Sequence, residues 1–145
     1  MDPVDYVDTF IAVADDSTAT EGTVPPTKVD DPSVAARTFA MIAEHPYGHT
    51  SGDVIFTVFA DRHGVPEQER AAARDAFYAR GQACLRASAL GKRYGWGVHA
   101  DADGRIALVG VETAEYADFV TGRRRGASGA PVDVTKAMRS SRASR

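Results

Sequence analysis

A segment rich in chemically versatile side chains runs from Arg86 to His99 of this 145-residue chain. Its fourteen residues include three cations, a hydroxyl, three glycines, two aromatic rings and a histidine. Arg and Lys pair with phosphate or carboxylate, glycines let the backbone approach a ligand closely, and flat rings stack on it. The segment therefore predicts a non-enzymatic binding or regulatory domain for an anionic small molecule or an acidic partner. The expected ligand-binding residues are Arg86, Ser88, Lys92, Arg93, Tyr94, Trp96 and His99.

A tight loop leading into a strand would use the same residues. Gly91-Lys92 lacks the upstream glycine and the following Ser or Thr of a nucleotide-binding P-loop, and Gly95-x-Gly97 lacks the third glycine of a dinucleotide fingerprint. In a loop of that kind, Gly95 and Gly97 would face a bulky neighbour and Trp96 would pack on the opposite side of the sheet. The binding site and the structural loop both remain open from the sequence.

Cys84 and His99 are the candidates for a catalytic role, and a small enzyme is the alternative hypothesis. A thiolate nucleophile needs a lowered pKa, and Arg86, Arg93 or His99 would lower the pKa of Cys84 if the fold brought them close. A lone cysteine also occurs commonly as a small buried apolar residue. Whether the chain is an enzyme is therefore left uncertain.

The histidines do not predict a metal site. His45 and His49 are four residues apart, but Pro46 and Gly48 lie between them and disfavour the helix that would align the two rings. The expectation is that the chain uses no metal and no other cofactor.

The net charge of −3 conceals an acidic body and a basic end. From residue 123 onward there are seven Lys or Arg and a single acid, a net +6, which leaves −9 for residues 1–122. A basic end can bind nucleic acid or the ribosome, or it can lie on the acidic body. Because a body at −9 would repel a phosphate backbone, nucleic acid is the less favoured partner, and it is kept as an alternative.

Composition indicates a cytoplasmic chain. One cysteine, Cys84, cannot form an internal disulfide, so no oxidising compartment is indicated. Apolar runs fall short of the ~20 residues of a membrane helix, and the acidic start lacks the features of a signal peptide. We therefore expect no membrane association.

The elements that must position these residues follow from apolar patterning and turn signals. Strands are predicted over residues 8–14, 53–60, 94–100 and 105–111, and helices over 33–44, 66–80 and 113–120. Asp101 to Gly104 forms a hairpin turn between the last two strands. The fold class is α+β: a layer of about four strands, at least the last two an antiparallel hairpin, packed with three helices. Residues 1–122 are the predicted single domain, and 123–145 the predicted basic, largely flexible tail, of which residues 132–137 can dock back.

Several segments together resemble a bacterial domain of unknown function, family 6157. The segments are Cys84-Leu85-Arg86-Ala87-Ser88, Lys92-Arg93-Tyr94-Gly95-Trp96-Gly97-Val98-His99, Thr9-Phe10-Ile11, Pro25-Pro26-Thr27-Lys28, Pro46-Tyr47 with Thr50-Ser51, and Lys136-Ala137-Met138-Arg139-Ser140. The resemblance covers nearly the whole chain and implies no catalytic role, because the family has no assigned activity. The insert Arg123-Arg124-Arg125 and the end from Ser141 to Arg145 look peculiar to this sequence.

Overall fold

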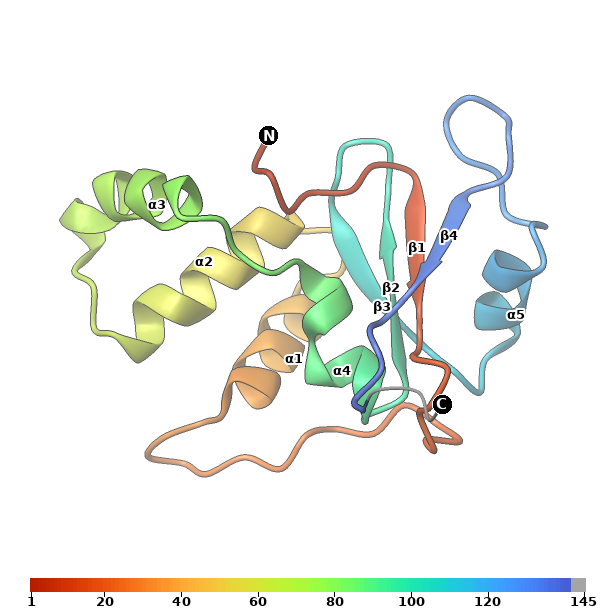
Figure 1. The fold of residues 1–145 in the computed structure, drawn as a ribbon, viewed down its shortest axis with the longest axis horizontal. Coiled ribbons are helices and arrows are strands. Elements are labelled where there is room, and N and C mark those ends of the chain that lie inside the picture. The colour runs from red at the N-terminus through yellow and green to blue at the C-terminus, as the bar shows by residue number, and fades with distance from the viewer. Residues whose placement is uncertain (142–145) are drawn as a thin grey trace.

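A four-stranded mixed sheet forms the centre of the computed structural model, which describes residues 1–141 (Figure 1). The strand order is β3-β2-β1-β4. The strands are β1 (Thr9–Ala12), β2 (Trp96–Ala100), β3 (Ile106–Gly110) and β4 (Asp133–Lys136). β1 pairs with β2 in antiparallel and with β4 in parallel orientation. The predicted α+β class and four-stranded layer are confirmed.

The hairpin of β2 and β3 forms as the Asp-Gly signal predicts. The two strands pair in antiparallel register, with His99 opposite Ala107. In the turn, the Asp101 carboxylate accepts hydrogen bonds from the backbone N–H groups of Asp103 and Arg105, both at 2.9 Å. Gly104 has a φ of 78°, a conformation that glycine adopts without strain.

Helices cover both faces of the sheet (Figure 1). On one face α1 (Val34–Glu44), α2 (Ser51–Arg62) and the short α4 (Ala89–Lys92) enclose the larger core, and on the other α5 (Ala114–Val120) covers a smaller one. α3 (Arg70–Ala79) lies on the far side of α2 from the sheet. The larger core includes Ile42, Val54, Leu90 and Val98. Phe10 and Phe119 stack at 4.5 Å in the smaller core.

The predicted strand over residues 53–60 is wrong, because this segment belongs to the helix α2. Thr50 and Asp53 form a capping box in which each side chain accepts a hydrogen bond from the other's backbone N–H, at 3.1 and 3.0 Å. These bonds satisfy N–H groups that have no partner inside the helix. The β-branched and aromatic residues that suggested a strand serve instead to pack α2 against neighbours on several sides.

The three predicted helices are present. Ser33 caps α1 by accepting from Ala36 N at 3.1 Å, and Thr113 caps α5 by accepting from Tyr116 N at 3.1 Å. The helix predicted for residues 66–80 consists of a 3₁₀ turn, η1 (Glu67–Glu69), followed by α3. A second 3₁₀ turn, η2 (Leu85–Ala87), precedes α4.

The docking expected of residues 132–137 takes the form of the edge strand β4. It supplies the fourth strand in place of the one predicted over residues 53–60. Val132 and Ala137 at its two ends are buried, each 5% exposed, whereas Val134 between them is 43% exposed. β4 is therefore held by backbone pairing and by one buried side chain at each end.

Candidate functional site: a basic surface and a buried histidine

The sheet separates the residues that the sequence grouped into one site. Alternate residues of β2 point to opposite faces. Trp96 packs against the core shared with α1 and α2, whereas His99 packs at 4.5 Å on Phe119 of α5. His99 therefore cannot share a ligand with the residues of η2 and α4.

Trp96 and Tyr94 are held by the loop that precedes α1. The Trp96 indole Nε1 donates to the carbonyl of Thr23 at 2.8 Å, and the Tyr94 carbonyl accepts from Thr23 N at 2.9 Å. Trp96 also packs on Phe39 of α1, with ring centroids 5.5 Å apart. A structural role is therefore enough to explain the contacts of Trp96 and Tyr94.

The glycines of this segment fit the expectation for a tight structural loop. Gly95 has a φ of 76°, and a Cβ there would lie 2.2 Å from the carbonyl oxygen of Glu21. A Cβ on Gly97 would lie 2.4 Å from the Phe10 ring. Gly97 thus faces a bulky neighbour while Trp96 packs on the opposite face, as the structural interpretation predicts.

The cations of η2 and α4 lie beside the end of the chain. Arg86 Nε donates to the Lys136 carbonyl at 2.7 Å, and Met138 N donates to the Arg86 carbonyl at 2.8 Å. Gly91 of α4 lies so close to Ala137 that a Cβ on Gly91 would come within 2.8 Å of the alanine methyl group. These contacts bring η2 and α4 beside β4 and the described end of the chain. The five cations of these segments are called here the basic surface: Arg86, Lys92, Arg93, Lys136 and Arg139.

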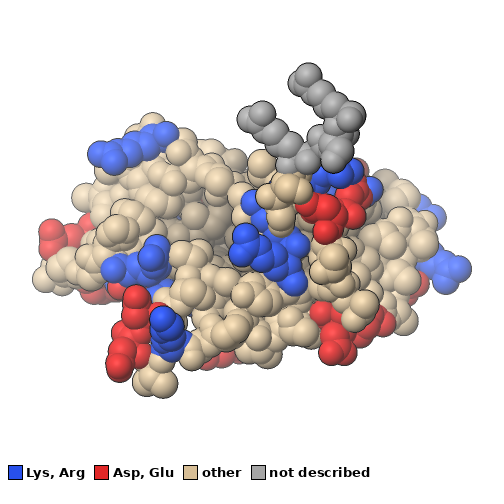
Figure 2. All heavy atoms as spheres, turned by 60° about the horizontal axis from the view of Figure 1, so that its bottom comes forward, with Lys and Arg blue, Asp and Glu red and all other residues tan. Residues whose placement is uncertain are grey.

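Acidic side chains adjoin the basic surface on one side. Asp15 Oδ1 lies 2.8 Å from Lys136 Nζ, and Asp15 Oδ2 lies 3.7 Å from an Arg139 nitrogen. The hydrogen bond from Lys136 and the nearby charges lower the pKa of the Asp15 carboxyl. Figure 2 looks onto the face with α4 and the described end of the chain, and shows Lys and Arg gathered at its middle beside acidic groups. Among the described residues, no carboxylate lies within ion-pair distance of Arg86, Lys92 or Arg93.

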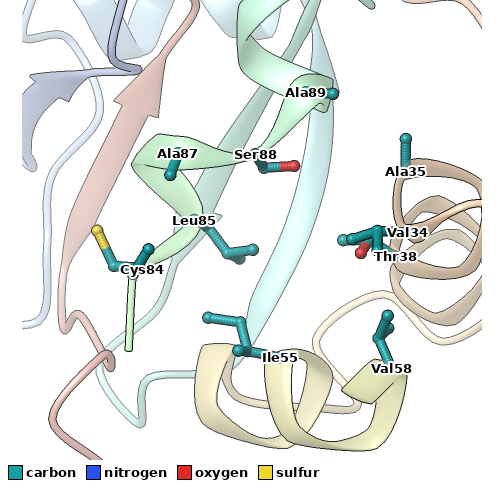
Figure 3. Close-up of a pocket in the computed structure, with 11 residues that line it drawn as sticks. Val34, Ala35, Thr38, Ile55, Val58, Cys84, Leu85, Ala87, Ser88 and Ala89 are labelled. Atoms are coloured by element: carbon teal, nitrogen blue, oxygen red, sulfur yellow. The ribbon is translucent and has the colours of Figure 1, made fainter. Parts of the chain in front are cut away.

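Cys84 and Ser88 lie at the two ends of η2 and line a pocket (Figure 3). The Cys84 sulfur is 3.3 Å from the Tyr6 hydroxyl oxygen. Burial, and then the hydrogen bond with Cys84, raise the pKa of Tyr6 to about 12. Because Cys84 belongs to the α2 face and His99 to the α5 face, the fold does not pair them as nucleophile and base.

His99 has a partner that the sequence did not reveal, Tyr47. The Tyr47 hydroxyl and His99 Nδ1 are 2.8 Å apart, although 52 positions separate the residues. Tyr47 has a φ of 58°, uncommon for a residue with a side chain. Pro46 and Gly48 disfavoured a helix around Tyr47, but no sequence signal connected this tyrosine to His99.

The surroundings of His99 favour its neutral form. His99 is 7% exposed, and burial followed by the charge of Arg124 lowers its pKa. Asp101, Glu115 and Asp8 act in the opposite direction. The arrangement allows His99 to hold Tyr47 in place without carrying a charge.

The described part of the basic end, residues 123–141, lies against acidic groups of the body. Arg123 is 3.8 Å from Asp118, and Arg124 is 3.8 Å from Glu115. The Arg124 guanidinium also lies over the Phe119 ring, 4.5 Å from its centroid.

The described part of the chain contains no group of three His, Cys, Asp or Glu side chains placed to hold a metal ion, and His45 and His49 pack edge to face with centroids 5.8 Å apart.

These features define a small α+β domain with a basic surface on one side of its sheet and a buried Tyr-His pair on the other. The chain belongs to the family described as Family of unknown function (DUF6157), whose model matches residues 1–143. No curated protein and no solved structure significantly matches it. Within residues 1–141, no helix is long and apolar enough to cross a membrane.

Proposed function

We propose that this chain is a cytoplasmic, non-enzymatic binding or regulatory domain that recognises an anionic small molecule or the acidic groups of a partner through its basic surface. The observation that carries the proposal is the clustering of Arg86, Lys92 and Arg93, none of which has a carboxylate within 4.0 Å among the described residues. Neighbouring cations without a carboxylate partner in the described chain favour an anion from outside the chain. The cytoplasmic location is supported by the single cysteine, Cys84.

The hydrogen bonding of Arg86 supports this role. Its Nε is engaged by the Lys136 carbonyl, and its two terminal nitrogens donate to no described residue. A guanidinium that is oriented before binding loses less conformational freedom when it pairs with a carboxylate or phosphate. Arg86 is therefore the anchor in the proposal, and Lys92 and the exposed Arg93 add charge beside it.

The remaining predicted residues have supporting positions in this proposal. Trp96 and Tyr94 hold the loop next to α4, and Ser88 caps α4 by accepting from Leu90 N at 3.2 Å. His99 lies on the other face of the sheet and makes no contact with the ligand. The proposed binding set is thus narrower than the one predicted from the sequence.

Replacing Arg86, Lys92 and Arg93 together with glutamine tests the proposal. We expect an oligoglutamate peptide, titrated at low ionic strength, to shift the backbone amide resonances of residues 86–93 and 136–140 in the unmodified protein. The triple variant should lose about tenfold in affinity, because each of three solvent-accessible charge pairs contributes roughly 0.5 kcal/mol. Added salt should weaken the binding in the unmodified protein.

The matched control replaces Lys28, Arg62 and Arg80 with glutamine. It removes the same charge from cations that also have no carboxylate within ion-pair distance among the described residues and that lie outside the basic surface. We expect the control to bind the peptide nearly as well as the unmodified protein. Equal losses in the two variants would show that only net charge matters and would contradict a specific basic surface.

A further inference from the structure

A pocket of about 230 Å³ separates η2 and the start of α4 from α1 and α2 (Figure 3). Eight of its eleven lining residues are Ala, Val, Ile or Leu. Small side chains on both sides create the space, with Ala35 on α1 and Ala87 and Ala89 on the opposite wall. Leu85, Ile55 and Val58 close the pocket toward the core.

Two hydroxyl groups interrupt this apolar lining from opposite sides. Thr38 on α1 is 5% exposed, and its Oγ1, which remains accessible to solvent, makes no hydrogen bond with any described residue. Ser88 accepts a hydrogen bond from Leu90 N, which leaves its own hydroxyl proton free to donate. Figure 3 shows the oxygens of Thr38 and Ser88 on the sides of α1 and α4 that border the pocket, whereas the Cys84 sulfur points away from it.

The size and chemistry of the pocket restrict what can fill it. An apolar cavity of roughly 150 Å³ accommodates benzene, so this space suits a single ring that carries a small substituent. No Asp, Glu, Lys, Arg or His lines the pocket, and a charged ligand would therefore lose its hydration without a partner. A hydroxyl that lines an apolar pocket and has no partner within the described chain favours a ligand that offers it a hydrogen bond.

We propose that this pocket is a binding site for a small uncharged molecule, a single ring or a branched hydrocarbon group bearing one hydroxyl or carbonyl. The ring lies between Ala35 of α1 and the alanines of the η2–α4 segment, and its polar group exchanges hydrogen bonds with Thr38 and Ser88. The site is distinct from the basic surface, because Arg86, Lys92 and Arg93 do not line it.

The experiment uses benzyl alcohol, toluene and benzoate as probes and follows the backbone amide resonances of the whole chain. Benzyl alcohol should cause saturable shifts at residues 34–38 and 83–89, and toluene should bind there more weakly. Benzoate should cause no shifts at residues 34–38, which lie outside the basic surface, because the pocket offers no partner for its charge. Absence of saturable shifts with benzyl alcohol, or equal binding of benzoate in the pocket, would overturn the proposal.

Two kinds of variant locate the binding. Thr38→Val preserves shape but removes the hydroxyl, and should weaken benzyl alcohol roughly three- to tenfold while leaving toluene unchanged. Ala87→Leu fills the pocket and should abolish binding of both probes. Ala35→Leu fills it from the opposite wall and should have the same effect. If one of these variants misfolds, the other still tests the site. Unchanged binding in a folded filling variant would place the probes elsewhere and refute the site.

The result is independent of the proposed function at the basic surface. The triple variant of Arg86, Lys92 and Arg93 should bind benzyl alcohol with the affinity of the unmodified protein. If the unmodified protein bound no peptide, only the proposed function would fail. If it bound no benzyl alcohol, only the pocket proposal would fail.

Discussion

His99 shows, at the scale of single residues, how burial changes the role that a side chain's type suggests. A histidine beside cations and a cysteine suggests acid-base chemistry, but this ring lies between the sheet and Phe119, with Tyr47 bound to its Nδ1. Phe119 also stacks on Phe10 and lies under the Arg124 guanidinium. The histidine thus belongs to a packed polar and aromatic cluster in the smaller core.

The lowered pKa of His99 predicts a pH dependence of stability. Because its folded pKa lies below the usual value of 6.5, the unfolded chain takes up a proton first as the pH falls. The stabilisation by neutral His99 is therefore complete above pH 6.5 and decreases below it, by at most about 1.4 kcal/mol per pH unit. Urea unfolding between about pH 7.5 and 5.5 measures this slope.

Replacing His99 with glutamine should reduce that slope, since glutamine keeps a hydrogen-bonding group near Tyr47 but does not titrate. His45→Gln is the matched control, because His45 is exposed, and it should retain the slope of the unmodified protein. The groups that act on the charge of His99 from neighbouring elements are Arg124, Asp101, Glu115 and Asp8. An undiminished slope in His99→Gln would assign the pH dependence to other groups.

α2 illustrates at the scale of elements how a local hydrogen-bond motif can outweigh strand-like composition. Its sequence alternates β-branched and aromatic residues, yet Thr50 and Asp53 supply a helix start. The helix then packs between α1 and α3, with Phe77 of α3 at 5.7 Å from Phe56 and 4.6 Å from Phe59. The position of α2 also determines one wall of the apolar pocket, through Ile55 and Val58.

Thr50→Ala should destabilise the protein by about 1 kcal/mol, because the backbone N–H of Asp53 then loses the hydroxyl that caps it. Thr57→Ala is the matched control on the same helix, where alanine is intrinsically favourable and Thr57 makes no hydrogen bond through its side chain with the described residues. Urea denaturation of both variants measures the difference. Equal stabilities would show that the capping box contributes little to α2.

The whole molecule combines an acidic body with a basic end that returns to it. Backbone pairing of β4 with β1 brings Lys136 to Asp15, and the turn before β4 brings Arg124 to Glu115. Exposed ion pairs of this kind each contribute little to stability. The burial of Val132 in the smaller core is therefore the stronger candidate for what holds the end of the chain in place.

Val132→Ala should cost about 1–3 kcal/mol in free energy of unfolding, because a buried side chain loses methyl groups and leaves a cavity. Val134→Ala, on the same strand but 43% exposed, should cost less than about 0.5 kcal/mol. Thermal or urea unfolding distinguishes the two. If both substitutions were nearly neutral, the docking of β4 would contribute little to the stability of the sheet.

The sequence by itself determined the elements that rest on local signals. The cap at Ser33, the Asp-Gly turn before β3 and the cap at Thr113 each lie within a few residues of the structure they direct, and the α+β class follows from them. Tertiary structure decided the partners, since it brings Tyr47 to His99 and Lys136 to Arg86. It also decided that the sheet separates His99 from Arg86. Strand register and packing between remote segments decide on which face of the sheet a side chain lies and which distant residues it contacts. Residue types and their spacing do not specify this register or packing locally. The segment from Arg86 to His99 was thus recognisable as a candidate site, and its division between two faces of the sheet was not.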